Sequence, residues 1–221
     1  MVEIIKKIVP EGKYGIKCPY TMKPSRIVVH NTANDASALN EIAYMTNNNK
    51  EVSFHYAVDD KMIVQGIEEN RNAWHSGDGA NGLGNREGIA IEICYSKSGG
   101  ERFIKAEQNA VDLIVSILKR YGWGINKVTK HQNYANKYCP HRTLDMGWER
   151  FIKMIEDKLN PVEPTPIEPA PTTSRKVGDV VTINGVALSD VMLKSNVKNY
   201  ATTSSTGEYS FETKANKMLI T

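Results

Sequence analysis

The chain has 221 residues and a formal net charge of +3, from 28 basic and 25 acidic side chains. Nucleic-acid-binding domains carry a clustered basic face, and this small, dispersed excess does not predict one. Three cysteines are too few for a disulfide framework and fit a reduced compartment or a metal site better. No stretch approaches the roughly eighteen apolar residues of a membrane span, so we expect no membrane insertion.

The N-terminal half predicts an arm followed by alternating strands and a helix. Residues 1–24 lack the apolar core and cleavage site of a Sec signal, so we expect synthesis in the cytoplasm, and their turns predict an extended arm. The β-branched run at 26–30 predicts a strand, and apolar positions at helical spacing predict a helix over 37–47. Residues 52–58 and 62–66, which flank two aspartates, predict a hairpin.

The following segment predicts the centre of the sheet and two further helices. The glycine-rich residues 76–85 lack the spacing and the lysine of a phosphate-binding loop, which favours a flexible connection or rim. Residues 88–95 form the most apolar run and predict a central strand. Amphipathic spacing predicts helices over 105–121 and 144–159. The whole of residues 1–159 therefore predicts an α/β domain, with a mixed central β-sheet flanked by helices.

The C-terminal part differs from this domain in composition. Residues 160–174 carry a proline at nearly every second or third position, which predicts a semi-rigid linker. Residues 175–221 predict short strands with a turn at Asn184-Gly185, and hence a small β-rich domain. Such a short segment buries little core alone, so we expect it to self-associate or to be ordered by a partner.

Two histidines and one cysteine are candidate metal ligands. His30 ends the strand at 26–30, and His131 and Cys139 lie in one polar segment eight positions apart. Two imidazoles and one thiolate are a common zinc set, and three protein ligands leave the fourth position to water. From the residues alone, each could instead be an ordinary buried or hydrogen-bonded side chain, and His141 could close a structural site as a fourth ligand.

Glu92 is a carboxylate inside the apolar strand at 88–95. A carboxylate in such a place is costly unless it is paired, and burial would raise its pKa toward the range of a general acid or base. The alternative is a structural salt bridge with Arg71 or Arg86. We therefore keep both a catalytic and a structural hypothesis for Glu92.

Further polar and aromatic side chains could surround the metal. Lys137 lies two residues before Cys139 and could stabilise an oxyanion, or could be a solvated lysine. The candidates for substrate binding are Asn31, Phe54, His55 and His75. For the last two histidines a structural role is an equal alternative.

Several of these segments occur in the order found in one known family. They are Val28-Val29-His30-Asn31-Thr32, Val52 through Asp59, Ala73-Trp74-His75-Ser76-Gly77, Ile91-Glu92-Ile93-Cys94, and His131 through Pro140. The ordered set resembles the zinc-dependent type-2 N-acetylmuramoyl-L-alanine amidases, which share their fold with peptidoglycan recognition proteins. Within that family it is most similar to endolysins of phages and prophages of Gram-positive hosts. The resemblance covers residues 1–159.

The resemblance implies roles for individual residues. It makes His30, His131 and Cys139 the ligands of one Zn²⁺, Glu92 the catalytic acid, and Lys137 the lysine beside the cysteine ligand. Some members carry a catalytic tyrosine just before the histidine of the second strand. This chain has Phe54 there, so Glu92 would do more of the proton transfer.

The implied activity is peptidoglycan hydrolysis. The bond cut would be the amide between the lactyl group of N-acetylmuramic acid and L-alanine of the stem peptide, on a cell wall reached by phage lysis or secretion. By analogy with modular endolysins, residues 175–221 would bind cell-wall carbohydrate. Two alternatives are a peptidoglycan-binding module without hydrolysis, which the presence of Cys139 argues against, and a structural zinc domain closed by His141.

Overall fold

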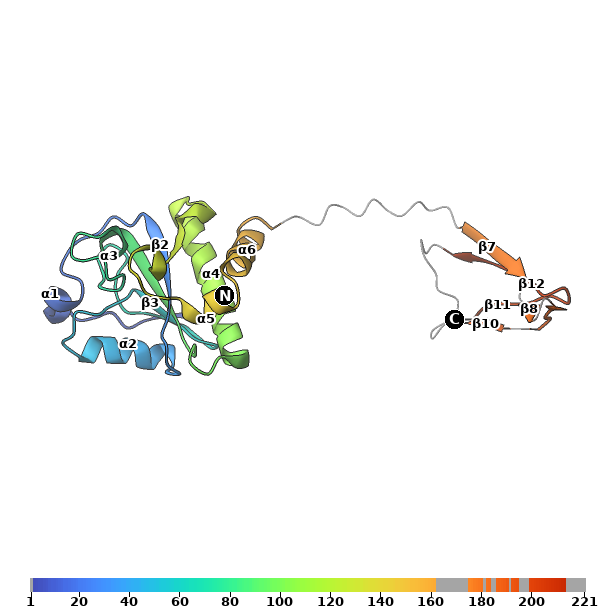
Figure 1. Cartoon of the computed structure of the whole chain (residues 1–221), viewed down its shortest axis with the longest axis horizontal. Helices are drawn as coiled ribbons and strands as arrows, with labels where there is room; N and C mark the ends of the chain where they lie inside the picture. The colour runs from blue at the N-terminus through green and yellow to red at the C-terminus, as the bar shows by residue number, and fades with distance from the viewer. Residues whose placement is uncertain are drawn as a thin grey trace. The chain divides into compact units, whose positions relative to one another are not determined.

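The computed structural model describes residues 2–161, 175–180, 182–183, 186–190, 192–194 and 199–213. The chain divides into two compact units, Met1–Pro161 and Val162–Thr221 (Figure 1). Most of the predicted linker, residues 162–174, and the predicted turn at Asn184-Gly185 lie outside the described residues.

The first unit is built on a six-stranded sheet with the order β1-β4-β3-β5-β2-β6. Its strands are β1 (Ile4–Lys6), β2 (Arg26–Asn31), β3 (Tyr56–Val58), β4 (Ile63–Gln65), β5 (Gly88–Ile93) and β6 (Val128–Lys130). Only the pairing of β3 with β4 is antiparallel among the described strands of this sheet. Strands β2 and β5 are buried along almost their whole length and mostly apolar, as expected for parallel strands with both faces covered.

Helices cover this sheet and complete the core. They are α1 (Tyr14–Lys17), α2 (Ala38–Asn47), α3 (Leu83–Glu87), α4 (Gly100–Tyr121), α5 (His141–Asp145) and α6 (Trp148–Leu159), with 3₁₀ turns η1 (Glu11–Lys13), η2 (Ile125–Lys127) and η3 (His131–Asn133). Helix α2 packs against β3 and β4, α4 packs against β3 and β5, and α6 lies beside α4 (Figure 1). The predicted α/β class, with a mixed central sheet flanked by helices, is confirmed, and the sheet is mostly parallel.

Four predicted elements need correction. The first 24 residues are no extended arm, because β1 pairs with β4 at the sheet edge and α1 follows it. In the predicted hairpin, only Tyr56–Val58 of the first arm is a strand. The helix expected from residue 105 begins at Gly100. The helix expected over 144–159 is divided into α5 and α6 at Gly147, whose φ of 102° suits glycine and few other residues.

The glycine-rich segment at 76–85 is an ordered rim and not a flexible connection. Asp78 accepts hydrogen bonds from the backbone N–H groups of Gly84 (2.6 Å) and Asn85 (3.2 Å) and so holds the start of α3. The Asn85 side-chain oxygen accepts from the N–H groups of His75 and Ser76, both at 2.8 Å. These bonds fix the backbone next to His75.

The described part of the second unit consists of strand pairs. The strands are β7 (Arg175–Val180), β8 (Thr182–Ile183), β9 (Val186–Ala187), β10 (Met192–Lys194), β11 (Asn199–Thr202) and β12 (Glu208–Thr213). They form the antiparallel pairs β7–β12, β8–β9 and β10–β11. Across both units, none of the described helices has the length and apolar character that crossing a bilayer requires.

Candidate metal centre

The sheet topology brings the predicted ligands to one edge. Strand β2 pairs in parallel with both β5 and β6, so the carboxyl ends of these three strands meet at the same edge of the sheet. His30 is the last residue but one of β2, and His131 directly follows β6. Glu92 pairs with His30 in the β2–β5 register. Cys139 reaches the same place from the segment before α5.

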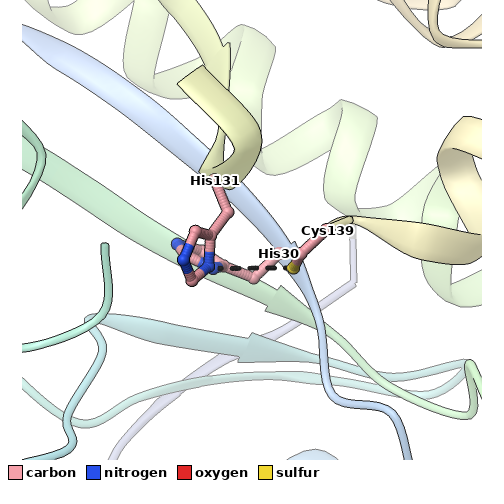
Figure 2. A group of neighbouring side chains, drawn as sticks. All are labelled: His30, His131 and Cys139. Carbon is pink, nitrogen blue, oxygen red and sulfur yellow. Dashed lines mark hydrogen bonds between the residues drawn. The ribbon is translucent and has the colours of Figure 1, made fainter. Parts of the chain in front are cut away.

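The three candidate ligands point toward one another, as Figure 2 shows. One ligand atom from each of His30, His131 and Cys139 lies within 4.8 Å of the other two, and all three residues are buried. The two Nδ1 atoms are 2.9 Å apart, and Sγ of Cys139 is 3.9 Å from Nδ1 of His30. Tetrahedral zinc with bonds of about 2.0–2.3 Å places its ligand atoms about 3.3–3.7 Å apart. The two nitrogens lie somewhat closer than this and the sulfur somewhat farther, so shifts of a few tenths of an ångström would let the three atoms bind one ion.

The electrostatics of the ligands also favour a cation. Two imidazole nitrogens at 2.9 Å need a shared proton or a cation between them. Burial, with the neighbouring histidines and Lys137, holds the pKa of His30 well below its usual value, and burial lowers the pKa of His131 to about 4. Burial, followed by Glu92, raises the pKa of Cys139 to about 11. Neutral imidazoles are metal ligands, and a divalent ion would stabilise the thiolate.

His75 contacts the nitrogen of the His30 ring that does not face the other two candidate ligands. Nε2 of His30 lies 3.0 Å from Nδ1 of His75, which is also 2.8 Å from the hydroxyl of Ser76. If Nε2 of His30 donates to His75, Nδ1 of His30 keeps its lone pair on the side of His131 and Cys139. This is the outer-sphere arrangement that fixes the tautomer of metal-binding histidines.

Glu92 lies beside the three candidate ligands and makes no ion pair with a lysine or arginine among the described residues. Its Oε1 is 4.0 Å from Nδ1 of His30, and its Oε2 makes no hydrogen bond with the described residues. Burial, followed by the charge of Glu41, raises the pKa of Glu92 to about 8. The side chain is still 17% exposed, so water can reach it. The structural salt bridge that we considered is absent, because Arg71 binds the carbonyl of Cys18 and Arg86 stacks on Tyr20.

His141 stays outside the ligand cluster. Its Nε2 lies 3.3 Å from the carbonyl oxygen of Ser96, on the loop after β5. The group of potential ligands found among the described residues contains His30, His131 and Cys139 and not His141. The geometry thus favours an open three-ligand site over a closed structural one.

Two adjoining hollows open at Glu92. One, of about 760 Å³, is lined by both ligand histidines, His75 and Lys137, with the aromatic side chains of Tyr20 and Trp74. The other, of about 560 Å³, runs along α2. Val52, Phe54 and Glu92 line both. Sequence reasoning missed Tyr20 and Trp74, although Trp74 stands inside one of the quoted motifs.

The rim between the hollows is fixed by a buried lysine that sequence reasoning also missed. Nζ of Lys17 donates to Oδ1 of Asn48 (2.9 Å) and to the backbone oxygens of Lys50 (2.5 Å) and Val52 (3.2 Å). Burial lowers the pKa of Lys17. Its position in α1, within the supposed arm, gave no signal of this role.

Two of the predicted substrate contacts are buried and line neither hollow. The ring of His55 is completely buried; its Nδ1 accepts from the N–H of Ala90, and its Nε2 donates to the carbonyl of Arg71, both at 2.9 Å. Asn31 is buried, and its amide is engaged with the protein. Because neither residue lines a hollow, the geometry favours structural roles for both, while Phe54 and His75 remain at the surface of the site.

A mostly parallel sheet with helices on its faces, three candidate metal ligands at its strand ends and an unpaired carboxylate beside them defines an α/β domain with a candidate metal centre. Within that class, the chain belongs to the N-acetylmuramoyl-L-alanine amidase family, Amidase_2, which it matches over residues 20–142. This confirms the family that the sequence motifs indicated.

Named relatives agree with this membership. The N-acetylmuramoyl-L-alanine amidase CwlA of Bacillus subtilis (strain 168) is 55% identical over 159 residues, which are 72% of this chain and 58% of CwlA. The chain therefore spans less than two thirds of CwlA. The structure of PlyL is 59% identical with a TM-score of 0.68, over 70% of this chain and 97% of PlyL. The PlyG catalytic domain is 55% identical with a TM-score of 0.69, over 74% of this chain and the whole of that domain.

Proposed function

We propose that the first unit is a zinc-dependent peptidoglycan hydrolase. It would cut the amide bond between N-acetylmuramic acid and L-alanine of the stem peptide. The observation that carries the proposal is the three-ligand cluster of His30, His131 and Cys139, whose two histidines line a hollow, with the unpaired carboxylate of Glu92 beside it. The family membership and the name of CwlA supply the substrate class.

The side chains divide the chemical work. His30, His131 and Cys139 would hold the ion. When bound, Zn²⁺ supplies Lewis-acid chemistry that polarises a carbonyl and acidifies water. Glu92 would take the proton of the attacking water and deliver it to the leaving nitrogen of L-alanine, for which a raised pKa suits it.

Lys137 and Phe54 complete this division. Lys137 lines the same hollow as Glu92, and its positive charge lowers the pKa of that carboxyl, so the two side chains interact electrostatically. We assign to it the stabilisation of negative charge on the carbonyl oxygen. Phe54 has no hydroxyl to share the proton transfer, and its ring lines both hollows beside Glu92.

Mass spectrometry of purified cell walls tests this function. The zinc-loaded full chain is expected to create new free amino groups on L-alanine while the glycan strands stay intact. New reducing sugar ends, or cleavage inside the stem peptide, would refute the assigned bond. If the protein bound the walls and released nothing, the non-catalytic binding module would be the correct alternative.

For the second unit we propose binding to cell-wall carbohydrate. The support is analogy with modular wall hydrolases, together with the antiparallel strand pairs of its described residues. The full chain carrying Glu92→Gln is expected to sediment with intact walls more completely than residues 1–161 with the same substitution. Equal sedimentation, or no loss after the wall carbohydrates are stripped, would refute the proposal. Light scattering of the full chain tests the expected self-association.

A further inference from the structure

Helix α5, which begins two residues after Cys139, has no capping side chain of its own. Its N-cap residue is Pro140, which offers no side-chain acceptor. The first N–H groups of a helix lack partners within the helix and need an acceptor from elsewhere. Oδ1 of Asn31 supplies it, accepting from the N–H of Arg142 at 2.9 Å and of Thr143 at 3.2 Å. The side-chain cap of α5 thus comes from Asn31 of strand β2, more than a hundred positions earlier in the chain.

The other half of the same amide binds back to the metal-binding strand. Nδ2 of Asn31 donates to the carbonyl oxygen of His30 at 3.1 Å and to the hydroxyl of Thr143 at 3.4 Å. The residue is 6% exposed, so both ends of its amide serve internal contacts. Asn31 therefore joins the backbone of one ligand, His30, to the helix that follows another.

Cys139 depends on such connections because it lies in an irregular segment. One side of it is held to the second ligand: the N–H of Gln132 donates to the carbonyl of Cys139 at 3.0 Å, which ties it to the turn that begins with His131. On the side of His30, the amide of Asn31 ties down the helix that starts directly after Cys139-Pro140. Across this tie, Sγ of Cys139 lies 3.9 Å from Nδ1 of His30.

We propose that Asn31 is a positioning residue of the metal centre, whose side-chain oxygen caps α5 and thereby holds Cys139 at ligand distance from His30. The inference rests on the proposed zinc chemistry and replaces the substrate contact that the sequence suggested for Asn31. Outer-sphere partners of this kind typically contribute about 10–100-fold to metal affinity.

Metal binding by three variants of the full chain tests this role. Asn31→Ala removes the cap, whereas Asn31→Asp keeps an acceptor oxygen in the same place. Asn109→Ala is the matched control, because Asn109 is also buried (7% exposed) and ties α4 to the carbonyl of Asp59, away from the cluster. The readouts are zinc affinity, by competition with a chelating dye, and the thiolate-to-cobalt charge-transfer absorption of the Co²⁺ form, which reports Cys139 ligation.

We expect Asn31→Ala to lose about 10–100-fold in zinc affinity and to weaken the charge-transfer band. Asn31→Asp and Asn109→Ala are expected to keep both near the wild-type values. An Ala variant with wild-type affinity and band would overturn the proposal, as would an elevated KM with unchanged metal binding, which indicates a substrate contact. If the Ala variant does not fold, the Asp variant decides, and its loss of the band would overturn the capping argument.

The outcomes separate this inference from the proposed function. Wild-type protein that binds zinc and cuts walls, with an unaffected Ala variant, would refute only the role of Asn31. If the wild-type protein cuts no amide bond, but the charge-transfer band weakens in Asn31→Ala and is kept in Asn31→Asp, the positioning role would be supported and only the activity refuted.

Discussion

The buried ring of His55 makes the stability of the first unit depend on pH. Burial lowers the pKa of His55 to about 4, against the opposing effects of its hydrogen bond to Arg71 and of Glu69. The unfolded chain takes up a proton at its ordinary pKa of about 6.5, whereas the folded chain does not until about pH 4. The unfolding free energy therefore falls as the pH is lowered from about 6.5 to about 4. Above about pH 7, His55 is neutral in both states and the unfolding free energy does not depend on its titration.

The size of the effect follows from the shift. A difference of about 2.5 pKa units corresponds to about 3 kcal/mol at 1.36 kcal/mol per unit, of which about 2.5 kcal/mol is lost by about pH 4.5. His55→Asn keeps an acceptor for the N–H of Ala90, cannot titrate, and leaves the carbonyl of Arg71 unpaired. We expect the variant to be about 1–3 kcal/mol less stable than wild type near pH 7.5, and this deficit to vanish or reverse near pH 4.5.

Urea unfolding followed by tryptophan fluorescence, with metal chelated throughout, measures this. The three tryptophans, Trp74, Trp123 and Trp148, all lie in the first unit, so the signal reports that unit within the full chain. The other histidines titrate in both proteins and largely cancel in the difference. A deficit that is independent of pH, or that grows on acidification, would refute the assignment of His55 as a neutral buried bridge.

Three further substitutions test other parts of the site. Glu92→Gln is expected to lower kcat about 10²–10⁴-fold on purified walls while zinc content stays at one per chain; residual turnover near wild type would exclude Glu92 as the proton carrier. His75→Ala is expected to weaken zinc binding about 10–100-fold at unchanged far-UV circular dichroism, and equal affinity would show that His30 needs no partner behind it. Lys17→Met is expected to cost about 1–3 kcal/mol in urea unfolding, because two part-buried carbonyls lose their donor, and to raise KM with unchanged zinc content. An unaltered KM would show that the rim at residues 48–52 does not contact substrate.

The sequence was sufficient for the elements and residues with strong local signals. The apolar runs at 26–30 and 88–95 predicted the two central strands, and the ordered motifs pointed to the histidines and the cysteine that the structure brings together. Strand β6, only three residues long and preceded by a 3₁₀ turn, has no alternation from which to recognise it. The start of α4 at Gly100 escaped prediction because two consecutive glycines weigh against a helix.

The roles of single polar side chains could not be predicted for a different reason. Sequence spacing places Asn31 and His55 next to residues of the site, but it does not tell whether a side chain points into a hollow or beneath it. For both residues the decision depends on partners that come from distant segments, such as Arg142 for Asn31 and Ala90 for His55. Likewise, the absence of an arginine beside Glu92 follows from where Arg71 and Arg86 find other partners.

The ligand segments enclose most of the first unit between them. His30 and His131 are 101 positions apart, and His30 and Cys139 are 109 positions apart. In the chain-entropy description of cross-links, closing a loop of about 100 residues disfavours the unfolded chain by about 4–5 kcal/mol. A bound ion would thus act as a reversible cross-link within the domain. Removal of the ion would abolish the proposed chemistry and would also lower the resistance of the domain to heat and proteases.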